Sequence, residues 1–317
     1  MKSRQRYRPC DSASKPAYSG PVTHSPDLSR REFLTYTALG AVAGGTLRAR
    51  ADTLTAQDIL ERIKQNIGVP WAEETVDTFK DGDPATPVTG VAVTMMATFD
   101  VVRRAAAQRA NLVITHEPTF YDHFDKLDVL EGEKDAVTAA KRAFIREHQM
   151  VVLRMHDHWH RRRPEPMSQN LSRVLGWERY WRPGTGFLFR IPETSVAELG
   201  ATIRQRLRAP TLRVVGTPGL RITNVALIPG AAGFPLHRHA LQMPDVEVLV
   251  IGEAREWETV EYVADAITAG QKKAMIVIGH IPSEQVGMEE FARWLGTFVK
   301  DVPIRFVPAA DPFWSPK

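Results

Sequence analysis

The sequence predicts an α/β fold, with two domains whose largely parallel sheets are flanked by helices. Apolar runs of strand length alternate with helix-like segments, and the joins between them are short. This alternation is typical of parallel sheets covered by helices. Of the 317 residues, 266 remain once an N-terminal segment of 51 is set aside, and that length suits two modest domains.

The N-terminal segment, residues 1–51, is interpreted as a twin-arginine export peptide. Its motif is Ser29-Arg30-Arg31-Glu32-Phe33-Leu34, a Gly- and Ala-rich run at 35–47 follows, and Ala49-Arg50-Ala51 is a small-x-small cleavage signal. The alternative is a basic tail with a chance arginine pair, but the order of the three features favours export. We therefore expect a periplasmic or extracellular protein that uses the twin-arginine machinery. The apolar run is too short to span a bilayer, so no membrane partner is expected after cleavage.

Charge and cysteine content narrow the classes of partner and ligand. Residues 1–51 hold nine Lys or Arg and three Asp or Glu, a net of +6, which taken from the whole-chain +4 leaves −2 for the rest. The basic character belongs to the leader, so it gives no support for nucleic-acid binding. The only cysteine, Cys10, also lies in the leader. Any bound metal must then use histidine and carboxylate ligands.

The first predicted domain covers residues 52–185. Thr55 is a plausible N-cap for a helix with apolar residues at Ile59, Ile63 and Ile67. A strand–helix–strand unit follows, and a second helix–strand pair repeats it, so a parallel sheet is expected. Its strands are predicted at 88–96, 111–114 and 150–153, and its other helices at 101–109, 136–147 and 168–175.

The second predicted domain covers residues 186–269, after a boundary at the Pro- and Gly-rich stretch 183–186. Residues 270–317 are then predicted to return to the first domain with a closing metal motif. Helices are expected at 196–208, 259–269 and 288–298, and strands at 212–215, 222–228, 246–251, 275–278 and 304–307.

Three clusters of metal-type ligands each follow a predicted strand. His116 and Glu117 follow the strand at 111–114, a run from His156 to His160 follows 150–153, and His280 with Glu284 follows 275–278. Ligands gather at the carboxyl ends of parallel strands, so the three clusters suggest one shared site. His280 and Glu284 are four residues apart, which would bring them to one face if the chain turns helical there.

These residues suit a centre for two divalent ions. Two ions about 3.5–4 Å apart need a bridging carboxylate and can hold a shared water as nucleophile. Glu117 and Glu284 are the candidates to bridge, and His116, His160 and His280 are candidate terminal ligands. His156 is either a ligand or a partner that orients one, and Glu117 or a histidine is expected to handle the proton. Imidazole and carboxylate ligands suit zinc, iron, manganese or nickel without choosing among them.

The same residues resemble those of the NGG-interacting-factor-three-like family of dinuclear metal proteins. The resemblance rests on the run at 91–120 with Thr-His-Glu-Pro-Thr-Phe, on Gly252-Glu253, and on the closing Gly279-His280 with Glu284. It implies metal-binding roles for His280 and Glu284, two interleaved domains, and a toroidal homo-hexamer with metal sites facing an inner cavity. This chain departs from the family pattern at Glu117, where a second histidine is usual, and at His160, where an aspartate is usual.

The other notable residues are given simpler interpretations. His123, His148, His237 and His239 are predicted on the surface or in loops, with His123 the one nearest to the site in sequence. The run 161–163 of three arginines is interpreted as solvated or as a subunit contact, ahead of an anion clamp. The Gly-rich stretch 229–233 lacks the Lys and the Ser or Thr of a nucleotide loop and is interpreted as a turn.

Two classes of function remain. The first is a metal-dependent hydrolase of a small-molecule substrate, and the sequence slightly favours it. The alternative is a non-catalytic hexameric protein that binds, stores or delivers metal or serves assembly. Some members of the resembled family are labelled GTP cyclohydrolase type-one homologues, but export weighs against that activity because nucleotides are scarce outside the cytoplasm.

Overall fold

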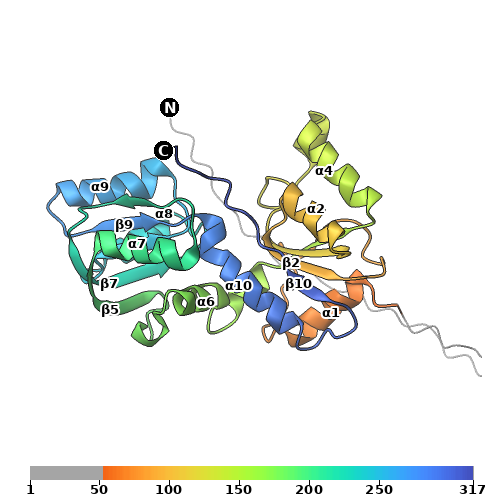
Figure 1. Ribbon diagram of the computed structural model, residues 1–317, viewed down its shortest axis with the longest axis horizontal. Coiled ribbons are helices and arrows are strands. Elements are labelled where there is room, and N and C mark those ends of the chain that lie inside the picture. The colour runs from red at the N-terminus through yellow and green to blue at the C-terminus, as the bar shows by residue number, and fades with distance from the viewer. Residues whose placement is uncertain (1–52, 317) are drawn as a thin grey trace, which may run out of the picture. The chain divides into compact units, whose positions relative to one another are not determined.

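The computed structural model describes residues 53–316, and the proposed export peptide lies outside them. These residues form a mixed α/β fold with two five-stranded sheets flanked by helices, so the predicted fold class is confirmed (Figure 1). The first sheet has parallel central strands and an antiparallel edge strand, β1. Its spatial order is β1 (Phe79–Asp81), β4 (Val151–Arg154), β3 (Leu112–Glu117), β2 (Val91–Met96) and β10 (Ile304–Phe306).

The second sheet has a parallel centre with an antiparallel strand at each edge. The carboxyl ends of its three parallel strands, β7, β8 and β9, therefore lie at one edge of the sheet, where ligands commonly bind. The spatial order is β5 (Leu188–Ser195), β7 (Arg221–Ile228), β8 (Val248–Ile251), β9 (Ala274–Val277) and β6 (Arg213–Val215).

Helices cover both faces of the first sheet, which explains why its strands are apolar throughout. In Figure 1, α2 and α4 lie on one face and α1 and α10 on the other. Residues 112–116 of β3 and all of β4 are buried. The helices are α1 (Ala56–Asn66), α2 (Phe99–Ala107), α3 (Asp128–Gly132), α4 (Ala136–Glu147), α5 (Asp157–Arg161), α6 (Pro166–Val174), α7 (Val196–Leu207), α8 (Phe234–Gln242), α9 (Glu261–Thr268) and α10 (His280–Leu295), with a 3₁₀ turn at Glu178–Tyr180 and a π turn at Glu256–Val260.

The helices predicted at the start of the chain, α1, α2 and α4, each begin at a capping residue. The Thr55 side chain accepts from the Asp58 N–H and forms a capping box with it, as the sequence predicted for the start of α1. Thr98 caps α2 by accepting the Val101 N–H, and Asp135 caps α4 by accepting the Thr138 N–H. Among residues 53–316, no helix combines the length and apolar character that crossing a membrane requires.

The last helix corrects a prediction that matters for the site. A helix was expected from residue 288, but α10 begins at His280, directly after β9 of the second sheet. The sequence left open a helical turn at His280 and Glu284, and the structure has one. Gly279 is the N-cap with φ +93°, and Pro282 falls in the first turn, where a helix needs no N–H donor. His280 and Glu284 therefore share one helical face, and α10 continues onto the first sheet (Figure 1).

Candidate metal centre

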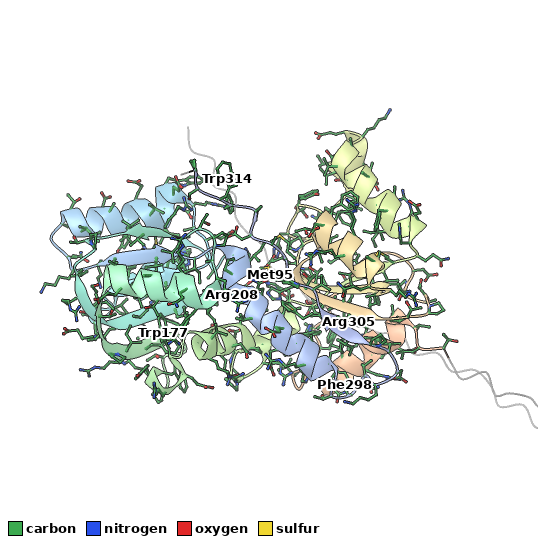
Figure 2. All side chains as sticks on the ribbon, in the orientation of Figure 1. Met95, Trp177, Arg208, Phe298, Arg305 and Trp314 are labelled. Carbon is green, nitrogen blue, oxygen red and sulfur yellow. The ribbon has the colours of Figure 1, made fainter. Side chains whose placement is uncertain are left out.

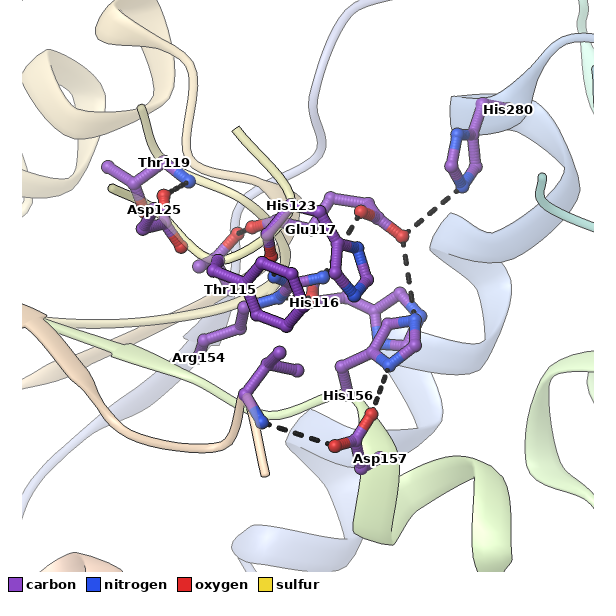
Figure 3. A network of polar contacts seen from close by, with 12 residues as sticks. Thr115, His116, Glu117, Thr119, His123, Asp125, Arg154, His156, Asp157 and His280 are labelled. Atoms are coloured by element: carbon purple, nitrogen blue, oxygen red, sulfur yellow. Dashed lines mark hydrogen bonds and ion pairs between the residues drawn. The ribbon is translucent and has the colours of Figure 1, made fainter. Parts of the chain in front are cut away.

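Three elements bring the candidate ligands together, and Figure 3 shows four of these ligands, His116, Glu117, His156 and His280. His116 and Glu117 end β3, His156 precedes the one-turn helix α5 and His160 lies within it, and His280 and Glu284 lie in the first turns of α10. The ligand atoms of His116, His156 and His160 all lie within 4.8 Å of one another. Those of His116, Glu117 and Glu284 do the same.

Glu284 lies at the middle of this arrangement. Its Oε2 is 3.0 Å from His280 Nε2 and 3.5 Å from His116 Nε2. Its Oε1 is 3.9 Å from His160 Nε2, which in turn lies 3.1 Å from His116 Nε2. One buried carboxylate thus faces three imidazoles, so it can bridge two ions as the sequence suggested.

Glu117 faces His156, the fourth imidazole, and shares His280 with Glu284. Its Oε1 is 3.4 Å from His280 Nε2 and 3.8 Å from His156 Nε2. Its Oε2 is turned the other way, toward Arg154 Nη2 at 3.5 Å. Arg154 is fully buried and also donates from Nε to the His116 carbonyl oxygen at 2.9 Å. Arg154 therefore fixes which oxygen of Glu117 faces the histidines.

The four imidazoles share one orientation, with Nδ1 held by an oxygen and Nε2 directed into the centre. This is the arrangement of metal-binding histidines, because an acceptor at one nitrogen fixes the tautomer that leaves the other free to ligate. The Nδ1 partners are the Met155 carbonyl for His116 (3.1 Å), Asp157 for His156 (2.9 Å), Glu165 for His160 (2.9 Å) and Glu253 for His280 (3.5 Å).

Asp77 holds α5 in place from a distant part of the chain. Its Oδ1 accepts the backbone N–H groups of His156 (2.6 Å) and Asp157 (2.9 Å), and its Oδ2 accepts the N–H of His158 (2.8 Å). The Asp77 carboxylate thereby caps a helix of five residues that lacks a cap of its own. Sequence reasoning missed this role, since nothing adjacent to Asp77 marks it as a cap.

His158 belongs to the same run of polar residues but points away from the centre. Its Nδ1 donates to Asp77 Oδ2 at 2.6 Å, and its Nε2 accepts the Ala72 N–H at 2.9 Å. The ring also stacks on Trp71, with centroids 3.7 Å apart. Both ring nitrogens are occupied, so His158 has a structural role.

The histidines of the centre differ in the direction in which their pKa values are shifted. Burial, reinforced by the neighbouring histidines, lowers the pKa of His116 well below its usual value and also lowers the pKa of His156. Burial acts the same way on His280, but hydrogen bonds to Glu117, Glu253 and Glu284 outweigh it and raise the pKa to about 12. The pKa of Glu117 is lowered to about 2, since contact with His280 overcomes the effect of burial.

The pKa of His160 is raised, like that of His280. Burial disfavours its charged form, but the hydrogen bond to Glu165 outweighs that effect and raises its pKa. The pKa of Glu165 is lowered by the same contact, despite its burial. Without metal, His280 is therefore protonated at pH 7, whereas His116 and His156 are neutral.

Metal uptake is expected to release about one proton per chain at pH 7, because ligation requires neutral imidazole and His280 is protonated below its raised pKa. Affinity should therefore rise with pH. The measurement is calorimetric titration with Zn²⁺ in two buffers of different ionisation enthalpy. His280→Gln should release about one proton fewer. An uptake heat that does not depend on the buffer would contradict these charge states.

Gly230 leaves the space that the Glu284 carboxylate fills. A Cβ at position 230 would lie 2.3 Å from Glu284 Oε1 and 2.8 Å from its Cδ. The backbone N–H of Gly230 donates to Ser283 Oγ at 3.0 Å, and Ser283 directly precedes Glu284. The Gly-rich stretch at 229–233 is thus a close approach between backbone and site, in agreement with its interpretation as a turn.

Gly230→Ala is expected to displace Glu284 and weaken metal binding about 10–100-fold, besides a backbone cost of about 1 kcal/mol for a positive φ. Gly68→Ala is the matched control, because Gly68 has a similar φ of +76° and no atom within 4 Å of the added Cβ. Zinc titration and thermal unfolding of both variants separate the two effects. Equal metal affinity in the two variants would contradict the packing role of Gly230.

The remaining histidines are placed as follows. His123 is exposed, with its ring against Phe124, and belongs to neither ligand group. His148 and His239 are exposed, in agreement with their prediction. The surface prediction for His237 was wrong: it is fully buried on α8, a helix the sequence analysis missed, and its Nδ1 lies 3.0 Å from Thr259 Oγ1.

The arginine run at 161–163 lies beside the centre without entering it. The Arg162 guanidinium lies over the rings of Trp159 and Trp294, 4.9 Å from each centroid. Arg163 donates to the carbonyl oxygen of His160 at 2.8 Å. Arg161 is exposed. These contacts are structural, and none of them places a guanidinium at the ligand atoms.

Comparison with known proteins agrees with this architecture. A family model described as Duf34/NIF3 (NGG1p interacting factor 3) matches residues 45–312. No curated protein matches the sequence of this chain closely enough to count as a relative.

Solved structures with low sequence identity share the fold. Staphylococcus aureus protein SA1388 is 17% identical over 83% of this chain and 100% of its own, with a TM-score of 0.63. A Bacillus cereus protein related to NIF3 is 13% identical over 83% of this chain and 99% of its own, with a TM-score of 0.65. Reduced HcgD from Methanocaldococcus jannaschii is 13% identical over 79% of this chain and 97% of its own, with a TM-score of 0.57.

Proposed function

Because this chain belongs to the Duf34/NIF3 family, we propose that it is a metal-dependent hydrolase that carries two divalent ions and acts on a small-molecule substrate. The observation that carries the proposal is the position of Glu284 between two sets of ligands. His116 and His280 both face its Oε2, His160 faces its Oε1, and His280 also faces Glu117.

The donor set fits divalent ions of intermediate softness. Three imidazole nitrogens and two carboxylates, without a thiolate, suit zinc, iron, manganese or nickel. Glu117 and His280 would hold one ion, His116 and His160 the other, and Glu284 would be shared, so His156 is left free to act on a proton. Ions in this position would polarise an ester or amide oxygen and lower the pKa of a water molecule.

The chain's own residues then have distinct tasks. Glu117 is ionised at neutral pH, because its pKa is about 2, so it serves as a ligand and not as an acid. His156 is neutral, and Asp157 holds its Nδ1, so its Nε2 is the atom that can accept a proton. Asp157 is in turn fixed by the Thr75 hydroxyl at 2.9 Å and the Val76 N–H at 3.1 Å.

Hydrolysis should require metal and His156. Zinc- or manganese-loaded protein would be assayed with nitrophenyl esters of phosphate, phosphodiester and acetate, before and after chelation. His156→Gln is expected to lower kcat about 10²–10⁴-fold, whereas His239→Gln, at an exposed histidine outside the centre, should not. Loaded protein that hydrolyses none of the three classes would favour the alternative, a non-catalytic metal-binding, storage or assembly protein.

The proposal includes export and self-association. The motif Ser29-Arg30-Arg31-Glu32-Phe33-Leu34 supports twin-arginine export to the periplasm or beyond, and membership of the family supports a homo-hexamer. Replacing Arg30 and Arg31 with lysine should leave the protein in the cytoplasmic fraction. Light scattering of the purified protein measures the mass, and a monomer would contradict the assembly.

A further inference from the structure

A cavity of about 900 Å³ adjoins the metal centre. Its wall contains the loops that follow β7, β8 and β9, so it lies at the carboxyl ends of the parallel strands. His280 and Glu253 are part of this wall, so the cavity reaches a candidate ligand of the centre. The volume is within the range of small-molecule sites, roughly 300–1,000 Å³.

Aromatic side chains form one side of this cavity. Phe234 comes from the start of α8, and Phe313 and Trp314 come from the C-terminal tail after β10. Trp314 is labelled in Figure 2. Phe313 is 69% exposed and Trp314 is 77% exposed, although both are large and apolar. They follow the stretch matched by the family model, which ends at residue 312. Most of their surface is thus available to a ligand.

The tail is anchored where it leaves the first sheet. Arg104 Nη2 donates to the Pro308 carbonyl oxygen at 2.7 Å, and Ala309 is buried in the core of that sheet. The Asp311 carboxylate then accepts the Phe313 N–H at 3.1 Å. These contacts hold the backbone just before the two aromatic residues, so the aromatic wall has a defined place beside the cavity.

The charged residues of the cavity rim are already paired. Arg213 lies 2.6 Å from Glu256, and Arg255 lies 3.4 Å from Glu258. Neither arginine therefore offers an uncompensated charge to an anion. Glu117, Glu253 and Glu284 already compensate the charge of His280, so an anionic group of a ligand would be attracted to that end by the proposed divalent ions.

We propose that this cavity binds a compound with a planar aromatic ring and one anionic group, the ring against Phe313 and Trp314 and the anionic group at the His280 end. The position of the anionic group rests on the proposed function, because it needs the divalent ions. The ring site rests only on the cavity and the tail.

The test compares phenylphosphonate with methylphosphonate, which share the anionic group and resist hydrolysis. Binding to the full zinc-loaded protein is measured by calorimetry. The phenyl compound should bind at least about tenfold more tightly, as expected for stacking on an aromatic side chain. Trp314→Ala should remove that preference. Trp257→Ala should keep it, because Trp257 is also exposed, at 72%, but does not line the cavity.

The outcomes separate this inference from the proposed function. A preference for the phenyl compound that depends on Trp314 but is equally strong in chelated protein supports the ring site while counting against the metal-centred function. Equal binding of the two compounds, or no binding of either, overturns the ring site. A preference that survives Trp314→Ala and Phe313→Ala together also overturns it.

Discussion

Asp77→Ala is expected to destabilise the protein by about 3–5 kcal/mol and to abolish high-affinity metal binding. The substitution removes the acceptor of the His156, Asp157 and His158 N–H groups and of the His158 ring. Each buried donor left without a partner costs roughly 1–3 kcal/mol. The start of α5 would then lose its cap, and His156 and His160 would lose their fixed positions.

Denaturant unfolding of metal-free protein gives the stability, and zinc titration gives the affinity. Asp135→Ala is the control, since Asp135 caps α4 through the Thr138 N–H on the far side of the first sheet from α10 (Figure 1). It should cause a much smaller loss of stability and leave the metal affinity unchanged. If Asp77→Ala binds zinc with unchanged affinity, Asp77 does not position the centre.

Glu284→Gln is expected to weaken the binding of both ions by more than roughly 100-fold. Loss of a residue that only hydrogen-bonds to a metal ligand costs up to about that factor in affinity, and Glu284 is proposed as a ligand itself. Glutamine keeps the size of the side chain but removes the negative charge that His116, His160 and His280 all face. Because one carboxylate serves both sets of ligands, the two ions should be affected together.

Competition with a chromogenic chelator measures this loss. Glu289→Gln is the matched control, because Glu289 is an exposed residue of the same helix. That variant should bind zinc like the wild type. Loss of only one ion in Glu284→Gln would contradict the shared position of Glu284, and unchanged binding would exclude it from the centre.

The parallel strands and their polar ends could be predicted from the sequence for a physical reason. Strands buried on both faces are continuous apolar runs, so the histidines and carboxylates that end them stand out. His116 with Glu117 and the run beginning at His156 were found this way. The structure also brings Glu117 within contact distance of His280, and His116 and His160 within contact distance of Glu284.

Other features of the structure could not be predicted, because no local sequence pattern indicates them. The start of α10 was missed because glycine and proline usually interrupt helices, yet both are tolerated at a helix N-terminus. Asp77 acts on a helix about 80 residues later, and such a long-range contact has no local pattern. The burial of His237 depends on the packing of α8 against Thr259, which its neighbours in sequence do not reveal.

The metal content of the mature, untagged wild-type protein, measured by elemental analysis after export, tests the central claim most directly. The arrangement of four imidazoles around Glu284 and Glu117 predicts about two divalent ions per chain. A protein that carries none would mean that glutamate at 117 and histidine at 160 do not support a metal centre, and the hydrolase proposal would be abandoned for a role in binding or assembly.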